Sequence, residues 1–329
     1  MVYETFDDLV GGGGIASIEA GHPDDLYVVS ASYEPRCISL TGALAPDYRS
    51  GSAIIYVNED HLTGQASSQM QTALDILQVS LRSKVEETRV VRGSWADAAA
   101  QVSALRSAIQ ELRREERPHR ITVDVTTFNR EALIVCLALL RATFHQATLR
   151  ILYVSPKSHG AWLSRGFRRV RSIVGFSGVQ QASRPTVLVV LSGFEGDRTI
   201  KIIEEYEPSR VFLGFGDPPT VKTFLDRNID EHKLILGRTD VEEFRFPAAG
   251  IVECSALLSA TIEPLLSTCN VVIAPMSTKL STVAAFLVAE RHREIQLAYC
   301  LPGEYNYSEY SEGMDRAFVE VLDFNEPSA

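Results

Sequence analysis

Apolar runs alternate with amphipathic segments along most of the chain, and this alternation predicts an α/β fold. Short apolar runs that end in polar or turn residues are typical of buried strands. In the first half of the chain such runs predict strands at 26–31, 53–57, 88–91, 121–125 and 149–154. The segments 69–85 and 95–116 have the spacing of amphipathic helices, and 130–142 is an almost wholly apolar helix. This order predicts a doubly wound unit with a parallel sheet.

The second half repeats the order of the first. It predicts strands at 187–191, 210–215, 233–236, 270–274 and 294–300. Recurrence of the same elements in the same order predicts an internal duplication: two tandem Rossmann-like doubly wound units with mostly parallel sheets. The predicted division of the chain is a flexible lead-in at 1–24, a first domain at 25–156, a basic linker at 157–185 and a second domain at 186–329.

The turns that follow matching strands also correspond. After the first strand of each half, an aromatic residue precedes a glutamate, so that Glu34 matches Glu195, and Arg36 matches Arg198 with one inserted residue. Turns of this kind place backbone N–H groups and a helix N-terminus at the carboxyl edge of a parallel sheet, where α/β proteins bind nucleotides or phosphates.

The turns after the fourth strands match as well. Alignment of these strands places Asn129 opposite Thr278 and Arg130 opposite Lys279, and an apolar helix follows in each half. Hydroxyl, amide and cationic groups are the donors that a nucleotide phosphate needs. The predicted ligand-binding residues at this edge are Ser32, Glu34, Arg36, Thr127, Asn129, Arg130, Ser192, Gly193, Glu195, Arg198, Ser277, Thr278, Lys279 and Tyr305.

A structural interpretation of the same residues stays open. Serine, threonine and asparagine before a helix are frequent N-caps. Glu34 with Arg36, and Glu195 with Arg198, could also be local ion pairs in the first turn of a helix.

Composition limits the class of partner. The chain has 329 residues, 45% of them hydrophobic, and a net charge of −10, which argues against general affinity for duplex nucleic acid or an anionic membrane. The first residues lack the pattern of a signal peptide, and no apolar run reaches the roughly 18 residues of a membrane span. We therefore expect a cytoplasmic protein that does not bind membranes.

The cysteines give no indication of a metal site. The five cysteines are scattered, with no CxxC pair and no Cys/His cluster, so we predict buried reduced thiols, no metal and no cofactor. Cys37 is the exception to watch, because it follows Arg36 at a predicted helix start, where a thiolate would be favoured.

No strong catalytic signature is present, and the sequence leaves open whether the protein is an enzyme. It lacks the GxSxG, HExxH, Walker A and GxGxxG patterns. If it is an enzyme, the candidate acids and bases are Glu195, Asp197, Glu34, Asp124 and Asp217. Because Asp124 lies inside an apolar strand, it is the carboxyl group most expected to have an unusual pKa.

The predicted linker at 157–185 differs in composition from the rest of the chain. It contains six cations together with Trp162 and Phe167. One interpretation is a solvated linker with a short hairpin or helix. The other is a basic lid or clamp for an anionic ligand or a single nucleic-acid strand, since arginine and aromatic side chains suit phosphate binding and base stacking.

The stretch 270–279, Asn-Val-Val-Ile-Ala-Pro-Met-Ser-Thr-Lys, followed by an apolar helix, resembles the strand, turn and Thr-Lys motif of CARF domains. These are Rossmann-like sensors of cyclic oligoadenylates associated with CRISPR. The resemblance implies that Thr278 and Lys279 lie against ligand phosphates, and by the duplication Asn129 and Arg130 as well. Here Met-Ser stands where that family has paired glycines. The resemblance also implies a prokaryotic source and an intramolecular version of the CARF dimer.

These observations favour a nucleotide-binding regulatory or sensor protein of a bacterial antiviral defence system, with a small nucleotide or oligonucleotide in the cleft between the two α/β halves. Its partner would be an effector protein or further copies of the same chain in a homo-oligomer. Two alternatives stay open. One is a metal-independent nucleotide-processing enzyme, either a cyclic oligonucleotide phosphodiesterase or a nucleotide glycosidase. The other is a scaffold subunit of a larger complex, for which the tyrosine-rich acidic stretch at 303–313 would be a partner surface.

Overall fold

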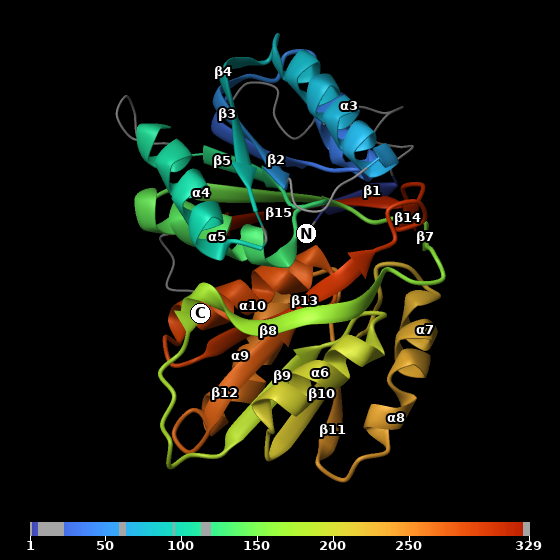
Figure 1. Ribbon diagram of the computed structural model, residues 1–329. Helices are drawn as coiled ribbons and strands as arrows, with labels where there is room; N and C mark the ends of the chain where they lie inside the picture. The colour runs from blue at the N-terminus through green and yellow to red at the C-terminus, as the bar shows by residue number, and fades with distance from the viewer. Residues whose placement is uncertain (1, 6–22, 59–63, 95, 113–119, 325–329) are drawn as a thin grey trace. The chain divides into compact units, whose positions relative to one another are not determined.

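The computed structural model describes residues 2–5, 23–58, 64–94, 96–112 and 120–324, which form two compact units (Figure 1). Unit 1 comprises Met1–Ser158 together with Ser311–Pro327, and unit 2 is built from His159–Tyr310. The chain therefore enters unit 2 once and returns to unit 1 near its end. The short strands β7 (Ser158–His159) and β14 (Ser311–Glu312) lie at these two passages.

Unit 1 is an α/β unit with one mixed sheet. Its further strands are β1 (Val2–Thr5), β2 (Asp24–Ala31), β3 (Ser50–Asn58), β4 (Val85–Gly93), β5 (Arg120–Asp124), β6 (Thr148–Val154) and β15 (Arg316–Asp323). Its helices are η2 (Pro35–Ile38), α2 (Ser39–Ala43), α3 (Gly64–Leu81), α4 (Ala98–Leu112) and α5 (Arg130–Thr143). The sheet order is β1-β15-β6-β5-β2-β3-β4, with β2 to β6 parallel and β15 antiparallel to both of its neighbours.

Alternation along the strands builds the core of unit 1. In β2, Tyr27 and Val29 point to one face, where they pack with Leu74 and Leu77 of α3 in one apolar cluster. On the other face, α4 packs against α5 and against β4. Burial of both faces explains why the parallel strands read as continuous apolar runs in the sequence.

Unit 2 has the same construction. Its further strands are β8 (Ser164–Ser177), β9 (Thr186–Leu191), β10 (Arg210–Gly216), β11 (Val241–Phe246), β12 (Asn270–Pro275) and β13 (Gln296–Tyr305). Its helices are α6 (Gly196–Tyr206), α7 (Phe224–Glu231), α8 (Lys233–Leu236), α9 (Ile251–Ile262), η3 (Glu263–Leu265) and α10 (Lys279–Arg291). The sheet order is β11-β10-β9-β12-β13-β8, with only β8 antiparallel to its neighbour.

Six strands of the unit 1 sheet and the six strands of the unit 2 sheet have the same order. In both, the order is third, second, first, fourth, fifth and then an antiparallel sixth strand. In unit 2, α6 to α8 cover one face, while α9 and α10 pack together and α10 packs against β12 and β13 (Figure 1). The structure thus confirms the predicted pair of Rossmann-like α/β units.

The antiparallel sixth strand of each sheet follows the five parallel strands of the other unit along the chain. β8 follows β6 along the chain but pairs with β13, and β15 follows β13 but pairs with β6. In each unit, the five parallel strands come from one continuous stretch of chain and the sixth strand comes from the stretch that follows the other unit's parallel strands, while β1 adds a seventh strand to the sheet of unit 1.

This exchange changes the division of the chain from the predicted one. The stretch 157–185, interpreted as a linker, contains β7 and the fourteen-residue strand β8. The stretch 311–323, placed in the second domain, belongs to the sheet of unit 1. Residues 2–5 of the predicted lead-in form β1, whereas its glycine run at 11–14 lies outside the described residues.

One predicted strand is wrong. Residues 233–236 form the short helix α8 instead, and the third strand of unit 2 is β11, whose sequence Val-Glu-Glu-Phe-Arg-Phe is mostly charged and aromatic. A four-residue apolar run does not distinguish a strand from one helical turn. Moreover, β11 lies at the edge of its sheet, where charged side chains are normal, so it lacks the apolar signature of the inner strands.

Among the described residues, no helix has both the length and the apolar character needed to cross a lipid bilayer.

Candidate functional site

The topology of each unit marks a switch point at the carboxyl edge of its sheet. In unit 1 the first and fourth strands, β2 and β5, are neighbours, and in unit 2 the same is true of β9 and β12. Connections leave these strands in opposite directions, so the loops after them flank the position at which open α/β sheets bind ligands. The predicted residues of 32–36, 127–130, 192–198 and 277–279 all lie in or beside these loops.

The helix after the fourth strand starts in the same way in both units. Asn129 is the N-cap of α5, and its Oδ1 accepts a hydrogen bond from the Ala132 backbone N–H at 2.7 Å. Thr278 is the N-cap of α10, and its Oγ1 accepts from the Ser281 N–H at 3.1 Å. The residues that follow are the cations predicted to correspond, so the structure confirms the alignment of the two turns.

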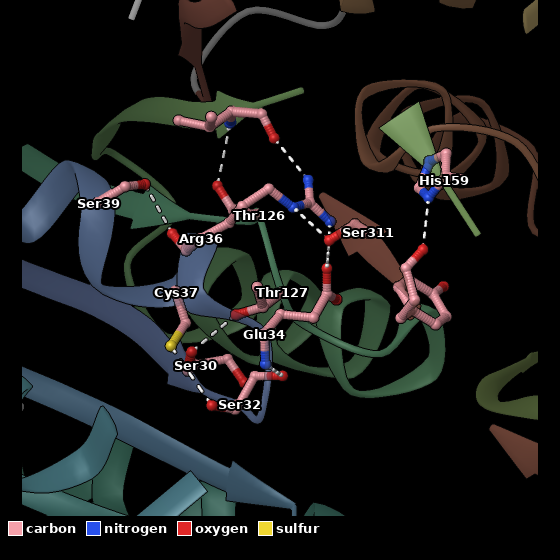
Figure 2. A network of polar contacts seen from close by, with 12 residues as sticks. Ser30, Ser32, Glu34, Arg36, Cys37, Ser39, Thr126, Thr127, His159 and Ser311 are labelled. Carbon is pink, nitrogen blue, oxygen red and sulfur yellow. Dashed lines mark hydrogen bonds and ion pairs between the residues drawn. The ribbon is translucent and has the colours of Figure 1, made fainter. Parts of the chain in front are cut away.

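The Glu34 and Arg36 side chains form a buried ion pair in unit 1. Glu34 Oε2 lies 2.5 Å from Arg36 Nη2, with 9% and 6% of the two side chains exposed. Arg36 Nη1 donates to the Val154 carbonyl at 2.7 Å, and Arg36 Nε donates to Ser311 Oγ at 3.2 Å. Ser311 Oγ in turn donates to Glu34 Oε2 at 2.7 Å (Figure 2). The network connects the loop after β2 to the end of β6 and to β14.

Unit 2 contains the same network. Glu195 Oε2 lies 2.5 Å from Arg198 Nη1. Arg198 also donates to the carbonyl of Cys300 in β13, and Ser164 in β8 donates to Glu195. Burial alone would lower the pKa of Arg198, but the Glu195 carboxylate outweighs it and raises that pKa above its ordinary value. In both units, therefore, the arginine bonds to a carbonyl of the fifth strand and the glutamate accepts from a serine of the exchanged segment.

This arrangement assigns a structural role to the four paired residues. Their charged groups bond to one another and to neighbouring hydroxyl and carbonyl groups, although Arg198 Nε has no hydrogen-bond partner among the described residues. A ligand would therefore have to replace several buried hydrogen bonds to reach them. We call the two sets the Glu–Arg latches: Glu34, Arg36 and Ser311 in unit 1, and Glu195, Arg198 and Ser164 in unit 2.

Small polar side chains in the switch-point loops hydrogen-bond to the backbone of their own loop or of a neighbouring strand. In unit 1, Thr127 Oγ1 donates to the Ser30 carbonyl at 2.8 Å, and Ser32 Oγ accepts from the Glu34 N–H at 3.2 Å. In unit 2, Ser192 Oγ donates to the Gly214 carbonyl at 2.6 Å.

Gly193 allows a close approach of two backbones in unit 2. A Cβ at this position would lie 2.3 Å from the carbonyl oxygen of Met276, in the turn after β12. The two loops that flank the switch point therefore touch through their main chains, and only glycine fits there.

Asp124 is a buried carboxyl group at the end of β5 in unit 1. Its Oδ1 accepts from the Thr126 N–H at 3.0 Å, and its Oδ2 has no hydrogen-bond partner among the described residues. Burial raises the pKa of Asp124 to about 7, as expected from its place in an apolar strand, although hydrogen bonds from Thr126 and, to a lesser extent, the Arg36 charge oppose the shift. In unit 2 the corresponding place, opposite Val190 of β9, is taken by Ala274.

The Cys37 side chain does not have the thiolate character that its place at a helix start favoured. Its side chain is fully buried, its Sγ donates to the Ser32 carbonyl at 3.5 Å, and burial raises the pKa of the thiol to about 12. The desolvation of the thiolate thus outweighs the helix start and the neighbouring arginine, and Cys37 stays protonated at neutral pH.

Three further predicted residues lie in unit 2, near the Glu195–Arg198 pair or the Gly193 turn. Asp197 is exposed in the first turn of α6, and Ser277 is half-buried before the Thr278 cap. Tyr305 ends β13, where its hydroxyl lies 3.4 Å from that of Tyr299, and burial raises the pKa of Tyr305 well above its usual range.

The sequence did not reveal an aromatic cluster beside the switch point of unit 2. The ring of Phe194, directly after Gly193, lies edge-on to that of Phe224 at 5.0 Å between centroids and 5.5 Å from the ring of His159. The guanidinium of Arg227 lies 4.6 Å from the Phe194 centroid. The sequence pattern indicated only Phe194, the aromatic residue before Glu195. Phe224, Arg227 and His159 come from other parts of the chain, so no local pattern connects them with it.

Within the described ranges, no group of three or more His, Cys, Asp or Glu side chains is placed to hold a metal ion.

Comparison with known proteins yields a likeness of fold. No family model matches the chain, and no curated protein matches its sequence. A solved structure described as a type III CRISPR defence DNA nuclease activated by cyclic oligoadenylate matches with a TM-score of 0.50 at 8% identity, covering 89% of this chain and 68% of its own.

Two sugar-nucleotide enzymes match more distantly. A UDP-N-acetylglucosamine 2-epimerase has a TM-score of 0.25 at 12% identity and covers 78% of this chain and 75% of its own. The UDP-GlcNAc 2-epimerase from Neisseria meningitidis has a TM-score of 0.24 at 8% identity, covering 76% of each chain. What the comparisons establish is that this chain shares its α/β fold with the CRISPR defence nuclease.

Proposed function

We propose that this protein is a nucleotide-binding regulatory protein, a sensor of a bacterial antiviral defence system, that binds ligand phosphates at the carboxyl edges of its parallel sheets. One observation carries the proposal. In both units, the helix that leaves the fourth strand at the switch point starts with a polar N-cap, Asn129 or Thr278, followed directly by a cation, Arg130 or Lys279.

Such helix starts suit phosphate groups. The first turn of a helix presents backbone N–H groups that have no partner within the helix, and the helix dipole adds partial positive charge. α5 and α10 have 14 and 13 residues, long enough to develop this dipole. In unit 1, the Nδ2 of Asn129 is buried with no hydrogen-bond partner among the described residues, so it is a further donor for a ligand.

Two further findings support a nucleotide ligand. The nuclease that shares the fold is described as activated by cyclic oligoadenylate, and the turn at 275–279 carries the CARF-like residues. In unit 2, the half-exposed ring of Phe194 lies next to the switch point, and aromatic rings there are suited to stack on a base.

Native mass spectrometry of the purified chain with mononucleotides, dinucleotides and cyclic oligonucleotides, cyclic oligoadenylates included, tests the proposal. The expected result is a bound nucleotide that is recovered unchanged. Calorimetry with that ligand should show weaker binding to Arg130→Ala or Lys279→Ala, by about ten- to a hundredfold, since a charge-assisted hydrogen bond contributes roughly 1.5–3 kcal/mol.

Lys233→Ala is the matched control, because Lys233 is a lysine of unit 2 with 68% of its side chain exposed and only an exposed aspartate as partner. Its affinity should equal that of the unaltered chain. Unchanged affinity in both Arg130→Ala and Lys279→Ala would show that the phosphates are bound elsewhere.

A specific observation also favours a second function, an enzyme that acts on nucleotides without a metal. The Asp124 carboxyl, with its pKa raised to about 7, has the value that suits a general acid or base at neutral pH. In that case the nucleotide would be converted during incubation, and Asp124→Asn would abolish conversion while the protein stays folded. Conversion that survives in Asp124→Asn would exclude this residue as the acid or base.

A further inference from the structure

Positive charge is concentrated in one segment of an otherwise acidic chain. The chain has 42 acidic and 32 basic residues, yet the 63 residues from Ala132 to Phe194 contain no aspartate or glutamate. Four arginines of this segment fall within seven residues of β8, at positions 165, 168, 169 and 171. Exposed charges act over about 10 Å at 0.1 M salt, so such a cluster can be locally attractive to an anion despite the net charge.

β8 carries these arginines at the edge of a sheet. Among the strands that the structure describes in this sheet, it pairs with β13 alone and is the last one. Residues 165 to 169 are all exposed, and Arg171 is half-buried. Arg165 and Phe167 pair with Glu304 and Pro302, beyond a bulge in β8, so they face the opposite side of the sheet from Arg169 and Arg171, and the arginines reach both faces of the edge strand. Arg169 and Arg171 lie on the same face of the strand, since both pair with β13 without a bulge between them. Their Cα atoms are therefore about 6.6 Å apart, a spacing comparable to that of successive phosphates along an extended nucleic-acid strand.

Aromatic rings are interleaved with the arginines. Phe167 is 46% exposed, and Lys201 of α6 lies 4.5 Å from its ring centroid. The guanidinium of Arg165 lies 4.2 Å from the ring centroid of Trp162. A cation held against one face of an exposed ring leaves a flat apolar surface with positive charge beside it, which is the composition of a base-stacking platform. We call Arg165, Phe167, Arg168, Arg169 and Arg171 the β8 strip.

Two arginines of the strip, Arg165 and Arg169, are not neutralised by an acidic side chain of the described residues. Within the described part of the chain, Arg165 and Arg169 have no carboxylate at salt-bridge distance, although Glu304 is the cross-strand neighbour of Arg165. By contrast, exposed arginines elsewhere in unit 2 are paired: Arg210 with Glu242 and Arg238 with Asp240. Charged edge strands also protect sheets from aggregation, but the other edge strand of this sheet, β11, carries both signs of charge.

We propose that the β8 strip binds single-stranded nucleic acid. Arginine binds phosphate oxygens with two parallel hydrogen bonds, and Phe167 stacks on a base, so recognition combines backbone and base without a sequence code. Duplex nucleic acid is disfavoured because it would bring the acidic remainder of the chain against many phosphates. The β8 strip shares no residue with the helix starts proposed above to bind the small nucleotide.

Fluorescence anisotropy of the full chain with labelled 20-nucleotide single-stranded RNA and DNA tests the inference. At low salt we expect a dissociation constant on the order of 10⁻⁵ M that weakens steeply as salt is added. The variant Arg165→Gln/Arg169→Gln should bind at least tenfold more weakly, and its slope of log affinity against log salt should be shallower by about 1.4, or roughly 0.7 for each lost phosphate contact. Phe167→Leu should weaken binding several-fold without changing that slope.

Arg210→Gln/Arg238→Gln is the matched control, because it removes two exposed charges from the same unit and should bind like the unaltered chain. Stronger binding of RNA than of DNA, or the reverse, would identify which strand is the natural one. Three results would each overturn the inference: no binding of either strand, equal loss of binding in the control variant, or equal binding of a poly-glutamate peptide. The last result would assign the strip to an acidic protein partner.

Discussion

The guanidinium of Arg36 donates a 2.7 Å hydrogen bond to the backbone carbonyl of Val154, the last residue of β6. The same bond recurs in unit 2, where Arg198 donates to the carbonyl of Cys300 in β13. In each unit, the loop after the first strand is thus fixed to the fifth strand, beside which the exchanged sixth strand pairs. The same buried glutamate, arginine and serine occur in both units, and in each unit the serine comes from the stretch of chain that contains or precedes the antiparallel strand. This repetition indicates that the network stabilises the fold that the two units share.

Removal of one charged partner of a Glu–Arg latch should lower the stability of the folded protein. Arg36→Met leaves the Glu34 carboxylate buried without its cation, and removal of one partner of a buried pair typically lowers the free energy of unfolding by about 3–5 kcal/mol. The double variant Glu34→Gln/Arg36→Met should recover part of this loss because neither of the two positions then carries a buried charge. Urea denaturation measures both. Arg210→Met, from a pair with 43% and 53% of its side chains exposed, is the control and should cost about 0–1 kcal/mol. A loss in Arg36→Met no larger than in the control would contradict the structural role of the latch.

Asp124→Asn should stabilise the protein in a manner that depends on pH. Burial raises the pKa of this carboxyl from 3.8 to about 7, so between these values the folded state binds a proton that the unfolded state has released. Stability of the unaltered chain therefore falls as pH rises toward 7 and levels off above it. Each pKa unit corresponds to about 1.36 kcal/mol, so the advantage of the variant should grow by roughly 2–3 kcal/mol between about pH 5 and pH 8.

Denaturation of both proteins at several pH values provides the measurement, with Asp197→Asn, an exposed carboxyl-to-amide change, as the matched control. An advantage that is constant across this range would show that Asp124 is ionised in the folded protein throughout.

The exchanged strands predict which fragment of the chain folds alone. A fragment of residues 159–310 contains all six strands of the unit 2 sheet and should unfold cooperatively on heating. A fragment of residues 186–329 lacks β8, exposes the edge of β13, and carries β15 without its partner β6, so it should aggregate or remain partly unfolded. Circular dichroism and gel filtration compare them. Equal folding of the two fragments would show that β8 is dispensable to its sheet.

Gly193→Ala should destabilise unit 2. The added Cβ would lie 2.3 Å from the Met276 carbonyl oxygen, so two backbones must move apart, at a cost of about 1–3 kcal/mol. Gly42→Ala is the control because nothing lies within 4 Å of its Cβ and the residue is in helix α2, where alanine is favoured. Thermal denaturation of the two variants should separate them, and similar melting temperatures would disprove the close approach.

Much of the fold was predictable because it is encoded locally. The apolar runs of β2, β3, β5, β6, β9, β10 and β12 are buried on both faces, so their signal does not depend on their neighbours. The match of Asn129 to Thr278 was also predictable, since an N-cap acts on the N–H groups two or three residues away. Asp124 could be expected to have a raised pKa because its sequence neighbours are apolar.

The sequence by itself determined the two repeated sets of parallel strands, the turns at their switch points and the concentration of positive charge between them. Only the tertiary structure decided where β8 and β15 pair, that β11 rather than residues 233–236 is the third strand of unit 2, and that Ser311 and Ser164 complete the Glu–Arg latches. The physical reason is that an edge strand can pair with any free edge, and a hydroxyl can bond with any carboxylate that folding brings near. Ser311 and Glu34 are 277 positions apart along the chain, so no local sequence pattern around either residue predicts that they form a hydrogen bond.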